Sequence, residues 1–93
     1  MLIFSFRGEG VDCRVIDCSE RGLHLTLPGE GSCLVGAQLE GTVRFRRGTE
    51  VFVTGQVVWE YRVERGVMLD PPGIPLKVIL DEQRWLRERG VLP

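Results

Sequence analysis

Hydrophobic and polar residues alternate with a period of two along most of residues 2–70. Such alternation predicts β-strands that bury one face, and clusters of glycine, proline, serine and aspartate interrupt it at short intervals. The pattern predicts six strands, at residues 2–6, 11–16, 23–27, 39–47, 51–61 and 64–69. Six short strands, each too narrow to bury its face alone, indicate a mainly β fold, a six-stranded antiparallel barrel.

Two of the predicted strands divide clearly into two faces. In the strand at 39–47, the predicted inner residues are Leu39, Gly41, Val43 and Phe45. In the longest strand, at 51–61, one face is predicted to carry Val51, Val53, Val57, Trp59 and Tyr61. Gly55 lies inside that strand and indicates a bulge or a bend of the barrel.

The last part of the chain changes to a helical period. One helical stripe contains the apolar residues Leu76, Ile79, Leu80 and Leu86. The acidic pair Asp81–Glu82 comes early in this segment and three arginines come late, an order of charges that stabilises a helix through its dipole. Gly90 suits the position after the last turn. We therefore expect a C-terminal α-helix over about 76–89, after a barrel over about 2–70, in a single domain that spans 1–93.

Length and charge narrow the class of protein. The 93 residues, 43% of them hydrophobic, are enough for one modest core. Twelve basic and thirteen acidic residues give a net charge of −1, so we expect no DNA or RNA partner. No apolar run approaches the roughly 20 residues that span a bilayer, and the first residues do not resemble a signal peptide. We expect a cytoplasmic protein without membrane insertion.

The most informative segment is Asp17-Cys-Ser19-Glu-Arg-Gly22, a polar stretch between two apolar strands. The aspartate and the serine can each hydrogen-bond to nearby backbone amides, and the glycine permits positive φ or the close approach of another group. Such a turn is ordered by its own side chains, so it can present polar groups to a ligand. The simpler alternative is that these residues only cap a hairpin turn.

This segment and its surroundings resemble the PilZ domain family. The similarity covers about residues 3 to 80 and includes the Asp-x-Ser-x-x-Gly segment, the Val35–Gly36 pair, the Val-x-Gly-x-Val-Val-Trp strand at 53–59 and the Gly-Val-Met-Leu strand at 66–69. PilZ domains are small bacterial β-barrels that act as receptors or adaptors in cyclic-di-GMP signalling. The resemblance implies a non-enzymatic module in which Asp17, Ser19 and Gly22 contact a guanine and the ribose-phosphate part of cyclic-di-GMP.

The chain departs from the family in one respect. Nucleotide-binding PilZ domains also carry an Arg-x-x-x-Arg motif before the first strand, and no arginine of this sequence lies four positions before another. Binding of two phosphates depends strongly on bidentate arginine contacts, so the resemblance implies weak binding. Arg14 and Arg21 are the expected substitutes. Alternatively, a partner donates the arginines, or an earlier start of the gene places the motif upstream of Met1.

Three cysteines and one histidine are the remaining candidates for chemistry. Cys13, Cys18, His24 and Cys33 have the residue types of a zinc site but not its usual spacing, so we expect no metal and no cofactor. A nucleophilic cysteine needs a base and an orienting partner, and we assign no catalytic residue. His24 is expected to be an exposed surface imidazole, and the thiols are expected to be reduced.

A protein-interaction adaptor is the competing hypothesis. Trp85 lies beside the helical stripe, and Arg44 and Arg46 belong to the densest basic group of the chain. Exposed tryptophan and arginine are favoured at interfaces, although Trp85 can equally pack over an end of the barrel and the arginines can form an ordinary solvated surface. Such an adaptor would have lost the ligand and would dock onto motility, pilus or exopolysaccharide machinery. The intact turn segment favours the receptor, whereas the absent arginine motif favours the adaptor.

Overall fold

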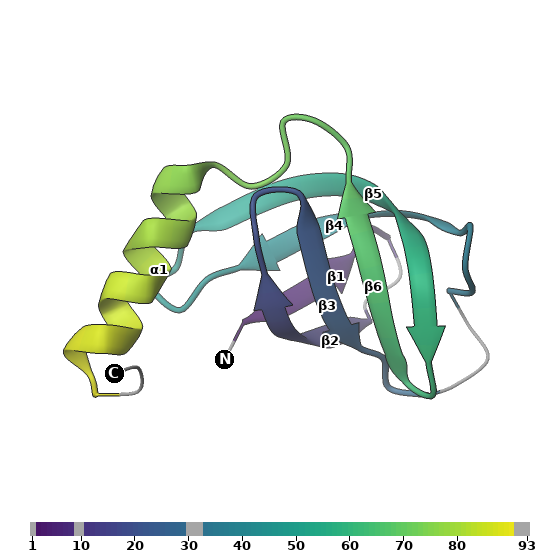
Figure 1. Ribbon diagram of the computed structural model, residues 1–93, viewed down its shortest axis with the longest axis horizontal. Coiled ribbons are helices and arrows are strands. Elements are labelled where there is room, and N and C mark those ends of the chain that lie inside the picture. Colours follow the sequence, from purple (N-terminus) through teal and green to yellow (C-terminus); the bar gives the residue numbers. More distant parts are fainter. Residues whose placement is uncertain (1, 9–10, 30–32, 91–93) are drawn as a thin grey trace.

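The computed structural model describes residues 2–8, 11–29 and 33–90, which form a closed β-barrel with a helix beside it (Figure 1). The elements are β1 (Ile3–Phe6), β2 (Asp12–Cys18), β3 (Gly22–Thr26), β4 (Gln38–Arg44), β5 (Glu50–Tyr61), β6 (Glu64–Leu69) and α1 (Leu76–Glu88). Their order around the barrel is β1-β2-β3-β6-β5-β4, and all neighbouring strands are antiparallel. The predicted six-stranded antiparallel barrel with a C-terminal helix is confirmed.

The interior of the barrel holds the hydrophobic core. Alternate residues of every strand point inward and are buried together, among them Phe4, Val15, Leu23, Leu25, Val53, Val57, Val67 and Leu69. The predicted inner face of the fourth strand is confirmed, because Leu39, Val43 and Phe45 are all buried. Gly41 shares this face and makes room for the Phe4 ring, which a Cβ at this position would overlap. Removal of this apolar surface from water is the main term that favours the folded barrel.

A β-bulge interrupts the alternation in β5. The register against β6 shifts between Val57 and Trp59, a few residues beyond Gly55. An extra residue in one strand turns the side chains beyond it to the opposite face. The prediction that Trp59 and Tyr61 share the buried face of Val57 is therefore wrong, since they are 41% and 60% exposed.

The helix α1 has the predicted position but faces the barrel with a different side. Gly90 follows its last turn with φ +70°, as expected for a glycine at this place. Ile79 joins the core, whereas Leu76 and Leu80 are about half exposed. The predicted stripe is therefore wrong at these two leucines. No helix within the described residues is long and apolar enough to cross a membrane.

A charged pair attaches α1 to the barrel. The prediction that Asp81 and Glu82 form an acidic start of the helix is wrong, because its first turn has no acidic residue and Glu82 is buried. Oε1 of Glu82 accepts a hydrogen bond from the backbone N–H of Arg46 at 3.0 Å, and Oε2 accepts one from its guanidinium at 3.2 Å. The guanidinium groups of Arg46 and Arg89 lie 5.7 and 4.1 Å from the centre of the Trp85 ring. A partly buried ion pair and cation–π contacts thus supplement apolar packing.

The β5–β6 hairpin lies at the end of the barrel away from α1 (Figure 1), and its β6 strand carries a buried arginine. Arg65 is 2% exposed, and its Nε donates to the Cys33 carbonyl at 2.9 Å. Its Nη1 donates to the carbonyls of Arg62 and Glu64 at 2.6 and 2.7 Å. These hydrogen bonds replace the water that a guanidinium loses on burial. Arg65 therefore ties the hairpin to the link that precedes β4.

Candidate functional site

The Asp-x-Ser-x-x-Gly segment forms the tight turn between β2 and β3. Asp17 and Cys18 end β2, Gly22 begins β3, and the N–H of Ser19 donates to the Gly22 carbonyl at 2.9 Å. Oδ1 of Asp17 accepts a hydrogen bond from the N–H of Cys18 at 2.9 Å. Within the described residues, Oδ2 of Asp17 and the hydroxyl of Ser19 have no hydrogen-bond partner, and both side chains are exposed. The predicted turn thus presents free polar groups to solvent.

The end of β6 and the link from β6 to α1 both contact this turn and order it. The carbonyl oxygens of Glu20 and Arg21 accept hydrogen bonds from the N–H groups of Ile74 and Leu69, both at 2.8 Å. Nε of Arg21 donates in return to the Leu69 carbonyl at 2.8 Å. Gly73 has φ +71°, and a Cβ at this position would overlap the Glu20 carbonyl oxygen. A ligand therefore meets a turn that is already ordered, which reduces the entropic cost of binding.

A shallow pocket of about 260 Å³ opens beside the turn. Four of the five predicted ligand residues line it, namely Asp17, Ser19, Arg21 and Gly22. The other wall comes from β5 and β6 and includes the exposed side chains of Val58, Trp59 and Met68. The pocket thus combines hydrogen-bond acceptors, one guanidinium and an apolar surface.

His24 and Trp59 form an aromatic pair in this pocket. His24 on β3 and Trp59 on β5 are both register partners of Gly66, which lies between them on β6. Because Gly66 has no side chain, the two rings meet there, with centroids 5.0 Å apart and an angle of 68° between their planes. The expectation that His24 is an exposed surface imidazole is wrong, since its side chain is only 31% exposed.

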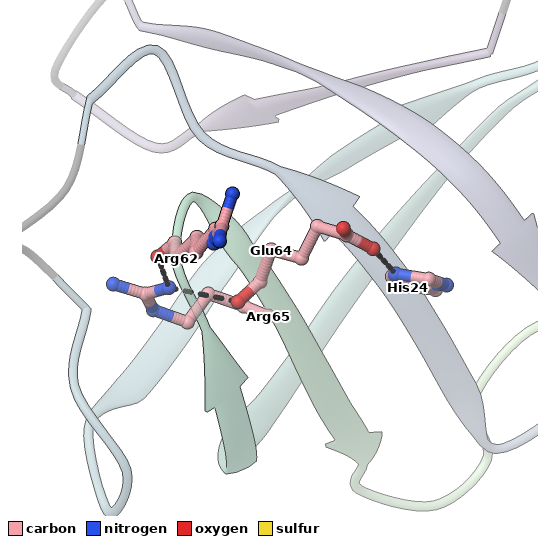
Figure 2. A network of polar contacts seen from close by, with 4 residues as sticks. All are labelled: His24, Arg62, Glu64 and Arg65. Atoms are coloured by element: carbon pink, nitrogen blue, oxygen red, sulfur yellow. Dashed lines mark hydrogen bonds and ion pairs between the residues drawn. The ribbon is translucent and has the colours of Figure 1, made fainter.

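A carboxylate from β6 holds the imidazole. Nε2 of His24 and Oε1 of Glu64 are 2.5 Å apart, and Figure 2 shows the Glu64 side chain directed at the ring, with the second ring nitrogen on the far side. Arg62 and Arg65 lie in the same hairpin as Glu64, and Nη1 of Arg65 binds the backbone carbonyls of Arg62 and Glu64 (Figure 2). The buried guanidinium therefore stabilises the backbone from which Glu64 reaches His24.

Two β-bulges turn side chains toward this site. The register shifts between Val15 and Asp17 in β2, and between Val57 and Trp59 in β5. Without the shifts, strict alternation would place Asp17 on the buried face of Val15 and Trp59 on that of Val57. With them, Asp17 is the register partner of His24, and both residues line the pocket together with Trp59. Bulges are often found next to functional sites for this reason.

The structure places the two candidate phosphate-binding arginines differently. Arg21 lines the pocket, although its Nε is already engaged by a backbone carbonyl. Arg14 is exposed on β2, opposite Ile3 and Thr26 in the sheet, and does not line the pocket. Among the described residues that line the pocket, Arg21 is thus the one arginine or lysine.

The structure brings two of the three candidate partner-binding residues into contact. Trp85 is half-buried and contacts Arg46, and both take part in the attachment of α1 to the barrel. Arg44 is exposed and lies 3.8 Å from Glu50 across the β4–β5 hairpin. A role of these residues in binding a partner stays a prediction.

Two of the three thiols have a raised pKa. Burial raises the pKa of Cys13 to about 11, and burial together with the neighbouring Asp17 carboxylate raises the pKa of Cys18 to about 11. Both thiols are therefore protonated at neutral pH, and a protonated thiol is a poor nucleophile and metal ligand. In residues 2–8, 11–29 and 33–90, no three His, Cys, Asp or Glu side chains gather in a way that could hold a metal ion.

Sequence reasoning missed the aromatic half of the site. Trp59 belongs to a strand that carries the family resemblance, but strict alternation predicted it on the same face as Val57, which the structure buries. The alternation of β3 did place His24 outside the core, between Leu23 and Leu25. Its contacts with β5 and β6 depend on the order of strands around the barrel, which neighbouring residues do not reveal.

Comparison with known proteins agrees with the fold and the turn. The model of the PilZ domain family matches residues 3–85. No match is found among curated proteins or among solved structures. The family match includes all six strands, the Asp-x-Ser-x-x-Gly turn and most of α1. The chain therefore belongs to the PilZ domain family.

Proposed function

We propose that this chain is a non-enzymatic effector module that binds cyclic-di-GMP in the pocket beside the β2–β3 turn. PilZ domains are binding or adaptor modules of cyclic-di-GMP signalling and are typically cytoplasmic, so the family supports this setting. The observation that carries the proposal is the convergence of Asp17, Ser19, Arg21 and Gly22 on one pocket that also has an aromatic wall.

The chemistry of the pocket suits a guanine and its ribose-phosphate. The amino group of guanine is a hydrogen-bond donor, and the free Oδ2 of Asp17 can accept from it. Trp59 offers an exposed ring for the base, and stacking of a base on an aromatic side chain contributes about 1–3 kcal/mol. The hydroxyl of Ser19 and the terminal nitrogens of Arg21 can donate to phosphate oxygens.

We expect weak binding. Bidentate contacts between arginine and phosphate are the strong, charge-assisted ones, and this pocket offers a single guanidinium to a ligand with two phosphates. Part of that guanidinium is already used, since Nε of Arg21 binds the Leu69 carbonyl. An affinity in the micromolar range or weaker, which falls with added salt, fits this arrangement.

Calorimetric titration of the 93-residue chain with cyclic-di-GMP tests the proposal. We expect saturable binding, and its loss in the Asp17→Ala/Ser19→Ala double variant. The matched control is Ser5→Ala/Asp12→Ala, which removes a second serine–aspartate pair, 2.6 Å apart and outside the pocket. No binding by a chain that circular dichroism shows to be folded, or equal losses in the two double variants, would refute the proposal.

The two arginines provide a second matched comparison. Arg21→Ala removes the one guanidinium of the pocket, and we expect an affinity loss of about tenfold or more, as for a charge-assisted hydrogen bond. Arg14→Ala removes an exposed guanidinium outside the pocket and should change the affinity little. A larger loss for Arg14→Ala would instead place the ligand along β2.

A protein-interaction adaptor is the alternative, and the exposed apolar surface favours it. Exposed apolar residues on β5, β6 and the link before β4 include Leu34, Val35, Val58, Trp59, Tyr61 and Met68. The link lies against β5, because the N–H of Val35 donates to Glu60 at 2.8 Å. Exposed apolar patches often mark binding surfaces. An adaptor would give no heat with cyclic-di-GMP, and Trp59→Ala would weaken its capture of motility, pilus or exopolysaccharide components.

A further inference from the structure

His24 brings a titratable ring into the pocket that Asp17 and Ser19 also line. Its Nε2 is engaged by Oε1 of Glu64, whereas Nδ1 has no hydrogen-bond partner in the described part of the chain. A carboxylate accepts hydrogen bonds, so this contact assigns the donor role to Nε2 and leaves Nδ1 as the ring nitrogen open to a ligand. Nδ1 is therefore an acceptor when the ring is neutral and a charged donor when it is protonated.

The groups around this imidazole determine what an anionic ligand meets. Asp17 from β2 and Glu64 from β6 are acidic, Arg21 from the turn is basic, and Trp59 from β5 carries no charge. The Cys18 thiol is neutral, because burial raises its pKa to about 11. With a neutral imidazole the local formal charge is negative, and a proton on Nδ1 cancels it. An anion is therefore attracted more strongly once the ring is protonated.

We propose that His24 is a phosphate-binding residue of this pocket. Its protonated Nδ1 donates to a phosphodiester oxygen of the nucleotide and supplements the single guanidinium that lines the pocket. The inference rests on the proposed function, since it concerns the same ligand and the same pocket. Glu64 acts as a positioning residue that holds Nε2, and the edge-to-face contact with Trp59 limits rotation of the ring toward β5.

The pH dependence of binding distinguishes this contact from the others in the pocket. Imidazole groups change charge between about pH 5 and pH 8, whereas a phosphodiester stays anionic throughout this range. Binding that requires a protonated His24 therefore takes up a proton at the upper end of the range. By linkage, the affinity then falls by up to about tenfold for each pH unit. The chain contains one histidine, so no other imidazole contributes.

The experiment is calorimetric titration with cyclic-di-GMP at about pH 6 and about pH 8, for the wild type and for His24→Gln. We expect the wild type to bind about tenfold or more tightly at the lower pH. The His24→Gln variant should bind with the same, weaker affinity at both. If His24→Gln folds poorly, Glu64→Gln provides a second test. Its amide oxygen can still accept from Nε2 but carries no charge that stabilises a protonated ring, so the difference in affinity between the two pH values should become smaller.

Three results would overturn the inference. A wild-type affinity that is equal at both pH values would overturn it alone and leave the proposed function intact. Tighter binding at the higher pH would also overturn it alone, because it would make the neutral Nδ1 an acceptor for the guanine. No binding at either pH by the folded chain would overturn the inference and the proposed function together.

Discussion

Replacement of Arg65 by methionine tests whether a buried guanidinium holds the end of the barrel together. Arg65 is 2% exposed and donates to the carbonyl oxygens of Cys33, Arg62 and Glu64 at distances of 2.6 to 2.9 Å. Methionine fills similar space but has no donor. The variant therefore leaves three backbone acceptors without their arginine partner, in the hairpin from which Glu64 reaches the candidate site.

The expected loss of stability follows from these three acceptors. A buried polar group that loses its partner costs about 1–3 kcal/mol. The acceptors lie near the end of the barrel, where water can partly replace the donor, so we take about 1 kcal/mol for each, or about 3 kcal/mol in all. Removal of a buried charge recovers part of this, because the guanidinium no longer has to be desolvated. We expect a net loss of about 2 kcal/mol.

Urea unfolding followed by circular dichroism measures this difference. For a small domain with an m-value of about 1 kcal/mol/M, the midpoint should fall by about 2 M at unchanged m. The matched control is Arg62→Met, an exposed arginine of the same hairpin whose guanidinium lies 5.4 Å from the centre of the Tyr61 ring, and we expect a change within about 0.5 kcal/mol. If Arg65→Met were as stable as this control, the carbonyls would be hydrated and the argument would fail.

Three further changes address the turn, the helix and the thiols. In Gly22→Ala, the new Cβ would lie 3.2 Å from the Ser19 hydroxyl. We therefore expect the affinity for cyclic-di-GMP to fall with little change in stability. An unchanged affinity in calorimetry would contradict a ligand contact at the turn. Arg46→Met removes the guanidinium from the buried carboxylate of Glu82, which then keeps the hydrogen bond from the backbone N–H at position 46, and it should lower the free energy of unfolding by about 2 kcal/mol. Arg44→Met breaks an exposed pair and should change the free energy of unfolding by less than about 0.5 kcal/mol. Similar urea midpoints would exclude a role of the ion pair in docking α1. Between about pH 9 and pH 11, Cys13 and Cys18 lose their thiol protons in the unfolded chain but keep them in the folded chain. The free energy of unfolding should therefore decrease as the pH rises through this window. The decrease should be smaller when both cysteines are replaced by alanine.

The strands could be predicted because a closed barrel buries one face of each of them. Leu39, Val43 and Phe45 alternate with polar residues, and the structure buries all three. The same rule fails beyond the β5 bulge, because one extra residue reverses the face of Trp59 while the local alternation continues in the sequence. A bulge depends on how two strands pair, which neither strand specifies alone.

Buried charges could not be predicted from a hydrophobic period. Leu76 and Leu80 fit a helical stripe as well as Ile79 does. However, α1 faces the barrel with Glu82, because Glu82 binds Arg46, which lies 36 positions earlier in the chain. Such a pair is stable only when both partners meet and their hydrogen bonds are satisfied. Its position is therefore a property of the tertiary structure, and each charge alone is typical of an exposed residue.

The candidate site divides in the same way into a local half and a topological half. The turn with Asp17 and Ser19 is encoded in consecutive residues, so the sequence alone predicts it. The aromatic half exists only because β6 lies between β3 and β5, and because Gly66 lets His24 and Trp59 meet across it. A chain with the same turn but a larger residue at the position of Gly66 would keep the polar groups and lose the wall that faces them. The Asp-x-Ser-x-x-Gly segment therefore indicates where a nucleotide can bind. Gly66 and the two bulges determine whether an aromatic surface is present there for a base to stack on.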